Sequence, residues 1–415
     1  MPGVSVGHTT SPRRGWLIPA LGLTQIVAWG SMFYAYGALM QPMQDELGLS
    51  KPVIVGAYSV ALLVSGLLST SAGSIIDRIG GRFLMGGGAV LAALMLACLS
   101  RVQGVLGLYL VWAGLGVAMS ATLYQPAFAV VTQIFGNDYR RAITHLTLFG
   151  GFASTVFWPL TQFLLQHVGW RETWLIYAAM NLLICLPIHA SLPKASAAAH
   201  SAPSEPAGAA SRSLHAVMRE PVFYLVTASV TLNALVFAAM SLHMLPVLQA
   251  RGISAVDAAW IGALVGPMQV LGRVLETTVG KRASTRHVGM AAISLLPLSL
   301  ILLFASGQWL PVYVVFAALY GIGNGVMTIV RGALPAELYG RAAYGAISGA
   351  MATPVQIAVA AGPFVASLLY SAGDGYPSTL LALAGISAAG AILFRYALAH
   401  LHQHEIRLSN ESTPT

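Results

Sequence analysis

Charged residues are scarce in this sequence: aspartate, glutamate, lysine and arginine make up only 8% of its 415 residues. Soluble globular proteins carry about 25% of such residues. Hydrophobic residues make up 57% of the chain, and large apolar surfaces mark contact with a membrane or another protein. The composition therefore excludes an ordinary soluble protein and predicts that most of the outer surface faces lipid.

Cysteine and the short motifs of common enzymes are equally scarce. Cys98 and Cys185, the only cysteines, lie in apolar stretches, which predicts small buried side chains without a disulfide or a metal site. The sequence has no GxxxxGK(S/T) phosphate-binding loop, no HExxH and no CxxC. We therefore expect no enzyme, no cofactor and no metal ion. The net charge of +8 is spread over short gaps between apolar stretches, so nucleic acid is not an expected partner.

Apolar stretches of about 18–25 residues are long enough to cross a bilayer as helices, and the sequence contains twelve. They cover approximately 16–41, 53–76, 83–100, 104–132, 142–167, 172–191, 221–246, 256–279, 287–305, 309–334, 343–370 and 376–399. The prediction is an all-α membrane protein with twelve transmembrane helices in two pseudo-symmetric six-helix bundles. The bundles would span 16–191 and 220–399, with a linker rich in alanine, serine and proline over 192–219 and tails over 1–15 and 400–415.

The distribution of basic residues predicts how the chain is inserted. With the N-terminus inside, cytoplasmic segments hold 15 of the 21 lysines and arginines, and external loops hold four. Short cytoplasmic loops are enriched in basic residues. We therefore expect a cell-membrane protein, in the inner membrane if the source is bacterial, with both termini cytoplasmic. The bilayer is its expected environment, and a monomer is the expected unit.

Six identities relate the two predicted bundles at a single spacing. Residues of the first bundle recur 204 positions later in the second, which indicates a duplicated six-helix unit. Such repeats are typical of secondary transporters, whose substrate site lies near the middle of the membrane between the repeats. The first-bundle residues are Met40, Pro42, Gly48, Ser50, Gly136 and Pro159, and their counterparts are Met244, Pro246, Gly252, Ser254, Gly340 and Pro363.

The stretch GSIIDRIGGRF, residues 73–83, follows the second predicted helix. It resembles the G-x-x-x-D-R-x-G-R-(R/K) signature of the major facilitator superfamily, although Gly81 departs where a basic residue is usual. A glycine lets helix ends approach closely, and an aspartate can accept N–H groups at a neighbouring helix N-terminus. We expect a gate that locks this end in one state; an ordinary loop with flanking charges is the alternative. The gate residues are Gly73, Asp77, Arg78, Gly80 and Arg82.

Arg273 lies inside the eighth predicted helix. At the 204-residue spacing it matches Ser69 and lies eight residues before the counterpart of Asp77, about 12 Å of helix into the inner half of the membrane. A competing spacing of 199 matches Glu276 to Asp77 but requires a five-residue deletion. An arginine at a helix centre costs about 2.5–3.5 kcal/mol and usually faces a wet cavity. Arg273 is therefore predicted to bind an anion or act in gating; snorkelling or pairing with Glu276 are the alternatives.

Arg331 lies toward the cytoplasmic end of the tenth predicted helix, where the sequence is equally consistent with a cavity position and with snorkelling. If both arginines reach the cavity, the site carries two positive charges and suits an organic anion. For Glu276, two readings stay open: pairing with a neighbouring cation, or carriage of a co-transported proton.

A longer stretch, residues 124–174, is similar to the monocarboxylate transporters and the bacterial oxalate/formate antiporters. In that group an arginine at the position of Arg273, preceded by glycine, is implied to bind the substrate carboxylate. Proton-coupled members often have an aspartate where Gln269 lies, and animal members have a lysine in helix one that this chain lacks. Both departures weigh against proton symport. The shared residues are Tyr124, Phe135, Gly136, Arg140, Arg141, Gly169, Trp170, Arg171 and Gly272.

The predicted function is secondary active transport of a small organic anion, a carboxylate, by alternating access. Arg273 would neutralise the substrate with help from Arg331, since a buried charge requires an opposite one. A carrier or exporter of a neutral or larger solute, such as a vitamin, sugar or drug, is the alternative, and a non-transporting sensor of the same fold is another. Further candidates for the cavity wall, each more typical of helix packing when taken alone, are Trp29, Tyr34, Tyr124, Gln125 and Asn233.

Overall fold

The structure, a computed structural model, describes residues 16–193, 212–280, 283–307 and 309–411. These residues form helices and the turns between them, which confirms the all-α prediction. The earlier helices are α1 (Leu17–Trp29), η1 (Gly30–Tyr34), α2 (Ala35–Leu47), α3 (Lys51–Ile79), α4 (Gly81–Leu99), α5 (Val105–Thr122), α6 (Tyr124–Phe135), η2 (Gly136–Asp138), α7 (Tyr139–Gly151), α8 (Ala153–Met180), η3 (Asn181–Cys185) and α9 (Leu186–Ala190). The later helices are α10 (Leu214–Val217), α11 (Pro221–Ala250), α12 (Ala255–Thr278), α13 (Thr285–Ala305), α14 (Leu310–Tyr339), α15 (Tyr344–Ala372) and α16 (Tyr376–Glu411).

Nine helical segments of the described chain are long and apolar enough to cross a membrane. One of them, Val105–Ala190, has 86 residues, about 130 Å of helix at 1.5 Å per residue and several times the 30 Å hydrocarbon core. This segment is interrupted, because Leu123 is extended and Gly169 has a φ of 82°. It covers three predicted crossings, so the nine segments account for eleven of the twelve, and α12, the helix that carries Arg273, is not among them. Each predicted crossing falls on one to three of the helices.

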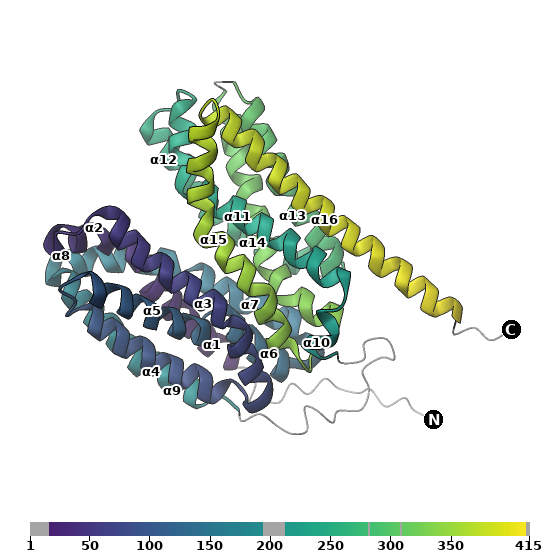
Figure 1. Cartoon of the computed structure of the whole chain (residues 1–415), viewed down its shortest axis with the longest axis horizontal. Helices are drawn as coiled ribbons and strands as arrows, with labels where there is room; N and C mark the ends of the chain where they lie inside the picture. The colour runs from purple at the N-terminus through teal and green to yellow at the C-terminus, as the bar shows by residue number, and fades with distance from the viewer. Residues whose placement is uncertain (1–15, 194–211, 281–282, 308, 412–415) are drawn as a thin grey trace.

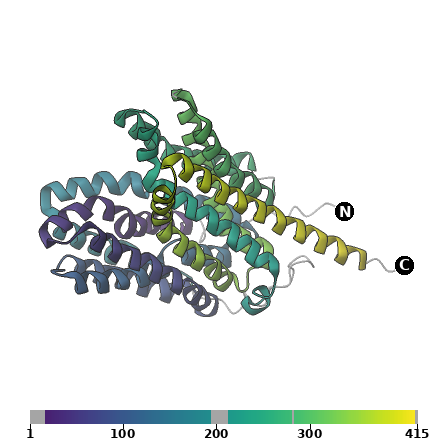
Figure 2. The same cartoon turned by 45° about the horizontal axis from the view of Figure 1, so that its top comes forward.

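The helices form two bundles, α1–α9 and α11–α16 (Figure 1). The first bundle has an apolar core that includes Trp112 and Trp174, and the second has two, which include Tyr313 and Phe394. Most of the predicted linker and both chain ends, residues 1–15, 194–211 and 412–415, lie outside the described residues. The predicted linker also includes the short helix α10. The last helix, α16, continues to Glu411, beyond the predicted end at residue 399, and extends past both bundles (Figures 1 and 2).

The spacing of 204 residues reappears in the backbone. Gly48 and Gly252 both have positive φ, of 65° and 82°, and Gly136 and Gly340 have φ of 56° and 80°. Positive φ is readily adopted by glycine and rarely by other residues. These conserved conformations at helix ends support the duplicated six-helix unit.

The same spacing relates the starts of the helices on either side of Arg273 to those around Asp77. α3 begins at Lys51 and α12 at Ala255, and the next helices, α4 and α13, begin at residues 81 and 285. Both pairs are 204 residues apart, so this region has no net five-residue deletion. The spacing of 204 therefore holds at the helix starts. At the helix ends α12 is five residues shorter, with 24 residues against 29 for α3, so Asp77 and Glu276 each lie two residues before the end of their helix, and the competing spacing of 199 stays a prediction for Glu276.

The two bundles lie close together at the end that holds α6 and α10 and diverge toward the end where the α2 and α12 labels lie (Figure 1). Between bundles, α3 packs against α15 and α7 packs against α12. Hydrogen bonds between the bundles join both of these helix pairs and also join α7 to the loop after α12. We call the end that holds Asp77, Arg140 and Glu276 the closed end.

Candidate functional site

A cavity lies between the bundles, and both contribute to its wall. Its volume is about 760 Å³ with the open space at its mouth included. Four of the seven predicted substrate-binding residues line it: Trp29, Tyr124, Gln125 and Arg331. The other lining residues are Leu123, Phe128, Val230, Thr328, Leu334, Ser348, Met351, Ala352, Val355 and Gln356.

Trp29 reaches the cavity from an irregular part of the first span. It ends α1, and the next five residues form the π-helical turn η1, a feature that is frequent at functional sites. Gly30 allows this turn to pack closely, because a Cβ there would lie 2.1 Å from the ring of Phe157. The Tyr34 ring ends the turn, 6.4 Å from the Trp29 ring and 6.1 Å from that of exposed Trp158.

The fourth span is broken next to the cavity. α5 ends at Thr122 and α6 begins at Tyr124, with one extended residue between them. Pro126 has no N–H to bond the carbonyl oxygen of Thr122 four residues earlier. The side-chain amide of Gln25, from α1, donates to that oxygen at 2.9 Å instead. The break therefore sets Tyr124 and Gln125 at the cavity wall, and a side chain from another span stabilises it.

Replacing Gln25 with leucine should distort this wall. The carbonyl oxygen of Thr122 would stay buried without a donor, at a cost of about 1–3 kcal/mol. We expect a melting temperature several degrees lower in a thermal-unfolding measurement on the purified protein. The matched control is Gln103→Leu, because Gln103 is exposed and outside any helix. Equal melting of the two variants would contradict a stabilising role for the Gln25 bond.

Arg331 reaches the cavity from α14 of the second bundle. It is partly buried, and within the described ranges it makes no hydrogen bond and belongs to none of the ion pairs. Tyr124 and Arg273 are near enough to act on it electrostatically. A guanidinium carries five N–H donors, and partial removal from water without partners is unfavourable. Arg331 is therefore an unoccupied donor group on the cavity wall.

Arg273 lies between the bundles without lining the cavity. Only 5% of the residue is exposed, and its Nη1 donates to the carbonyl oxygen of Thr147 on α7 at 3.0 Å. Its Nε has no acceptor among the described residues. A Cβ at Gly151 would lie 2.1 Å from Nη1, so this glycine makes the approach possible. In this conformation Arg273 joins the bundles, and the described ion pairs give Glu276 to Arg140 instead. Its role in substrate binding stays a prediction.

The pair of glycines in α7 is the part of this site that sequence reasoning missed. A Cβ at Gly150 would lie 2.2 Å from the hydroxyl oxygen of Tyr124. Gly150 and Gly151 therefore provide room for Tyr124 and Arg273 on one side of α7. The available signal was the pair itself, because small residues in membrane helices mark positions of close approach.

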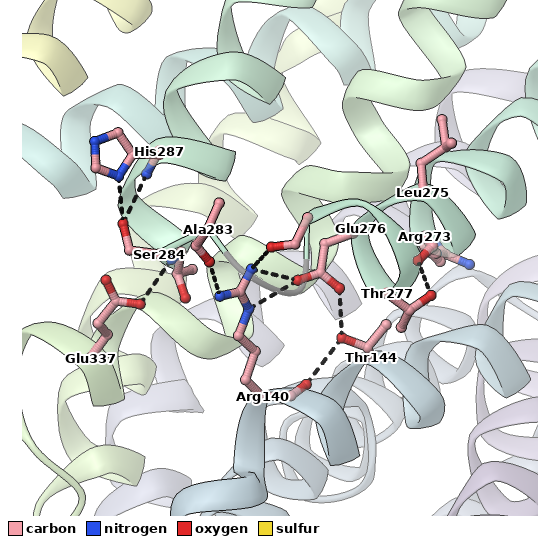
Figure 3. Close-up of polar contacts among 12 residues, drawn as sticks. Arg140, Thr144, Arg273, Leu275, Glu276, Thr277, Ala283, Ser284, His287 and Glu337 are labelled. Carbon is pink, nitrogen blue, oxygen red and sulfur yellow. Dashed lines mark hydrogen bonds and ion pairs between the residues drawn. The ribbon is translucent and has the colours of Figure 1, made fainter.

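Glu276 pairs with Arg140 of the other bundle, which corrects the predicted alternative of pairing with Arg273. Arg140 Nε and Nη2 lie 2.9 and 2.8 Å from Glu276 Oε1, and Thr144 Oγ1 donates to Oε2 at 3.1 Å. Arg140 also donates to two backbone carbonyl oxygens of the loop after α12. Figure 3 shows its side chain reaching from α7 to the end of α12. Carriage of a proton by Glu276 stays a prediction.

Asp77 holds the first turn of α15 at the same end. Its Oδ1 and Oδ2 accept hydrogen bonds from the backbone N–H groups of Gly345 and Ala346 at 2.9 and 2.8 Å. A helix N-terminus favours a negative charge there. Gly73 allows the two helices to meet, because a Cβ there would lie 1.8 Å from the carbonyl oxygen of Gly345. This is the contact that the sequence predicts for Asp77.

The remaining signature residues surround the turn between α3 and α4. Gly80 connects the helices with a φ of 81°, Arg78 is exposed, and Arg82 is partly buried. Gly81 departs from the signature for a steric reason, since a Cβ there would lie 2.1 Å from Val130 Cγ2. The role of these residues in switching between states stays a prediction.

Besides Arg273, two more predicted cavity residues lie outside the lining, Tyr34 and Asn233. Asn233 is buried on α11, which packs against α16 as well as α15. Tyr34 lies beside the cavity, because its ring neighbours the ring of Trp29, which lines it. The predicted set therefore divides into a group around the cavity and one residue, Asn233, within the second bundle.

The family follows from the sequence as well as from this architecture. Residues 21–287, more than half of the chain, match the Major Facilitator Superfamily. The protein belongs to this superfamily and is a multi-pass membrane transporter. An MFS-type transporter of Gibberella moniliformis is 26% identical over 392 residues, which cover 91% of this chain and 88% of that protein. The uncharacterized MFS-type transporter YcxA of Bacillus subtilis is 25% identical over 187 residues, which cover 43% of this chain and only 44% of YcxA.

Solved structures show the same fold at low sequence identity. The human organic anion transporter MFSD10 matches with a TM-score of 0.70 and 17% identity, covering 93% of this chain and 100% of that one. The Escherichia coli fucose:proton symporter FucP matches with a TM-score of 0.70 and 17% identity, covering 92% and 99%. An outward conformation of FucP matches with a TM-score of 0.62.

Proposed function

We propose that this transporter moves a small organic anion that binds through Arg331. The observation that supports this proposal is a guanidinium without a hydrogen-bond partner among the described residues, on the wall of a cavity between two bundles. Glu276 does not neutralise it, because the carboxylate of Glu276 is paired with Arg140. An anionic solute would supply both the charge and the acceptors that Arg331 lacks.

Arg273 has a different part in the proposed cycle. In the present conformation its Nη1 is bonded to Thr147 on the opposite bundle. When α7 and α12 separate, this bond breaks and the guanidinium becomes available to the solute. Arg331 therefore makes the first contact, and Arg273 strengthens anion binding after the switch. This reverses the order of importance that the sequence favours.

Alternating access would use the contacts of the closed end. The moving units are the predicted bundles 16–191 and 220–399, and the gate is the contact of Asp77 with α15 together with Gly73, Arg78, Gly80 and Arg82. With both termini in the cytoplasm, the closed end is cytoplasmic and the diverging end faces outward. We also place the protein in the monocarboxylate and oxalate/formate group, by the residues of its stretch 124–174.

Binding of monocarboxylates to the variant Arg331→Gln tests the proposal. A hydrogen bond to a charged group is worth about 1.5–3 kcal/mol, so the dissociation constant should rise about 10- to 150-fold in a titration of the purified protein. The control is Arg101→Gln, which removes the same charge from an exposed position outside the lining and should bind normally. An unchanged affinity in Arg331→Gln would overturn the proposal and favour a neutral solute.

A further inference from the structure

We propose that the solute is an aromatic monocarboxylate: a flat ring system that lies on the first bundle and one carboxylate that binds Arg331 on the second. The inference rests on the proposed function and adds two properties of the solute to it: the number of its negative charges and the aromatic character of its carbon skeleton. It follows from the unequal chemistry of the two cavity walls.

The wall of the first bundle is a continuous aromatic surface. Trp29, Tyr124 and Phe128 all line the cavity. The Trp29 and Tyr124 rings lie 5.1 Å apart, and the Tyr124 and Phe128 rings stack at 5.1 Å with 12° between their planes. The three rings hold one another in place and so form a preorganised wall. An aromatic ring of a solute can pack against such a wall, because aromatic rings attract one another at centroid distances of this size. A rigid, flat body fits this wall with less loss of conformational entropy than a flexible chain.

The wall of the second bundle provides the charge and, apart from Gln125 of the first bundle, the hydroxyl and amide side chains that accompany the aromatic rings. Arg331 is the one charged residue among the described cavity-lining residues, and Thr328, Ser348 and Gln356 supply hydroxyl and amide groups. Arg273 is outside the lining and already bonded to a backbone carbonyl oxygen. One cation neutralises one carboxylate. In this conformation a second carboxylate would lose water without gaining a counter-charge, which is unfavourable, because Arg273 stays bonded to Thr147.

The anchoring of the aromatic wall further supports a ring-binding role. Trp29 directly precedes the π-helical turn η1, and Tyr124 directly follows the break in the fourth span that Gln25 stabilises. The indole N–H of Trp29 is buried and has no acceptor within the described ranges. Two separate backbone irregularities thus lie next to the rings that form this surface.

A matched set of solutes tests the inference by isothermal titration calorimetry on the full-length purified protein. The solutes are naphthoate, the neutral amide naphthamide, the dianion naphthalene dicarboxylate, and the aliphatic monocarboxylate octanoate. Naphthoate should bind at least about tenfold more tightly than each of the other three, because only naphthoate has both the ring and a single charge.

Variants of the aromatic wall separate the ring contact from the charge contact. Trp29→Leu should weaken naphthoate about three- to tenfold and leave octanoate unchanged, whereas Trp29→Phe, which keeps a ring, should retain most of the affinity. The control is Trp158→Leu, since Trp158 is 57% exposed and does not line the cavity. Retained binding in Trp29→Phe also shows that the site folds correctly.

The outcomes distinguish this inference from the proposed function. Octanoate or the dicarboxylate binding as tightly as naphthoate, with loss in Arg331→Gln, would overturn the aromatic monocarboxylate and leave the anion carrier standing. Naphthamide binding as tightly as naphthoate, with no loss in Arg331→Gln, would overturn both. Equal naphthoate affinity in Trp29→Leu and the wild type would remove the aromatic wall from recognition.

Discussion

Replacing Gly73 with valine should prevent the closed end from forming. The new Cβ would lie 1.8 Å from the carbonyl oxygen of Gly345, and a backbone atom, unlike a side chain, has no alternative rotamer to adopt. α3 and α15 would have to separate, and Asp77 would lose its bonds to α15. Overpacking of this kind costs about 1–3 kcal/mol or more, so the closed population should fall at least about fivefold.

Cysteine labelling measures this shift. Ala336 is buried where α14 meets helices of the first bundle at the closed end, so a cysteine there is protected while that end is closed. With Cys98 and Cys185 replaced by alanine, Gly73→Val should increase the rate of reaction with a water-soluble maleimide about fivefold or more. Gly87→Val is the control, because nothing lies within 4 Å of its new Cβ. Equal rates in the two variants would contradict the α3–α15 contact as a closing element.

Removing the side chain of Arg140 should have the second largest effect. Glu276 is only 5% exposed, and Arg140→Leu would leave its carboxylate buried without a cation. Breaking a buried ion pair by removing one partner costs about 3–5 kcal/mol. The lower end of this range applies, because the Arg140 side chain is itself partly exposed. We expect a clearly lower melting temperature together with faster labelling of a cysteine at Ala336.

The double variant Arg140→Leu/Glu276→Leu gives the decisive comparison. It removes the unpaired charge along with its partner, so it should melt close to the wild type. Arg141→Leu is the matched control, since Arg141 is the adjacent arginine on α7 and is exposed. If the double variant were as unstable as Arg140→Leu, the loss would come from packing and the ion pair would not be the cause.

The helical architecture could be predicted because it depends on local properties of the sequence. A crossing requires enough consecutive apolar residues to span the hydrocarbon core, and such stretches are visible without knowledge of the fold. The contact of Asp77 was also predictable, because residues 73–83 resemble the superfamily signature, in which a glycine allows close approach and an aspartate can accept N–H groups at a neighbouring helix N-terminus. These features need no information about how helices rotate.

The site depends on helix rotation and on distant partners, which the sequence does not fix. Arg273 and Arg331 are both arginines inside apolar helices, yet only Arg331 lines the cavity. Each residue turns a helix by about 100°, so rotation decides which face meets the cavity, and packing sets that rotation. The partner of Glu276 lies 136 residues away, and Gln25 lies 97 residues from the carbonyl group that it satisfies. Partners this far apart in the sequence produce no local pattern from which the contact could be predicted.

The division of the cavity between an aromatic wall and a cationic wall affects the energetics of the whole cycle. A solute that touches both adds an attraction between the bundles that the unloaded protein lacks, so it lowers the free energy of occluded intermediates selectively. Counterflow is the exchange of labelled for unlabelled solute across the membrane, and only the loaded carrier reorients in it. Net efflux also requires the empty carrier to reorient, so counterflow should be faster than net efflux. Equal rates of counterflow and efflux in proteoliposomes would show that the solute does not tie the bundles together.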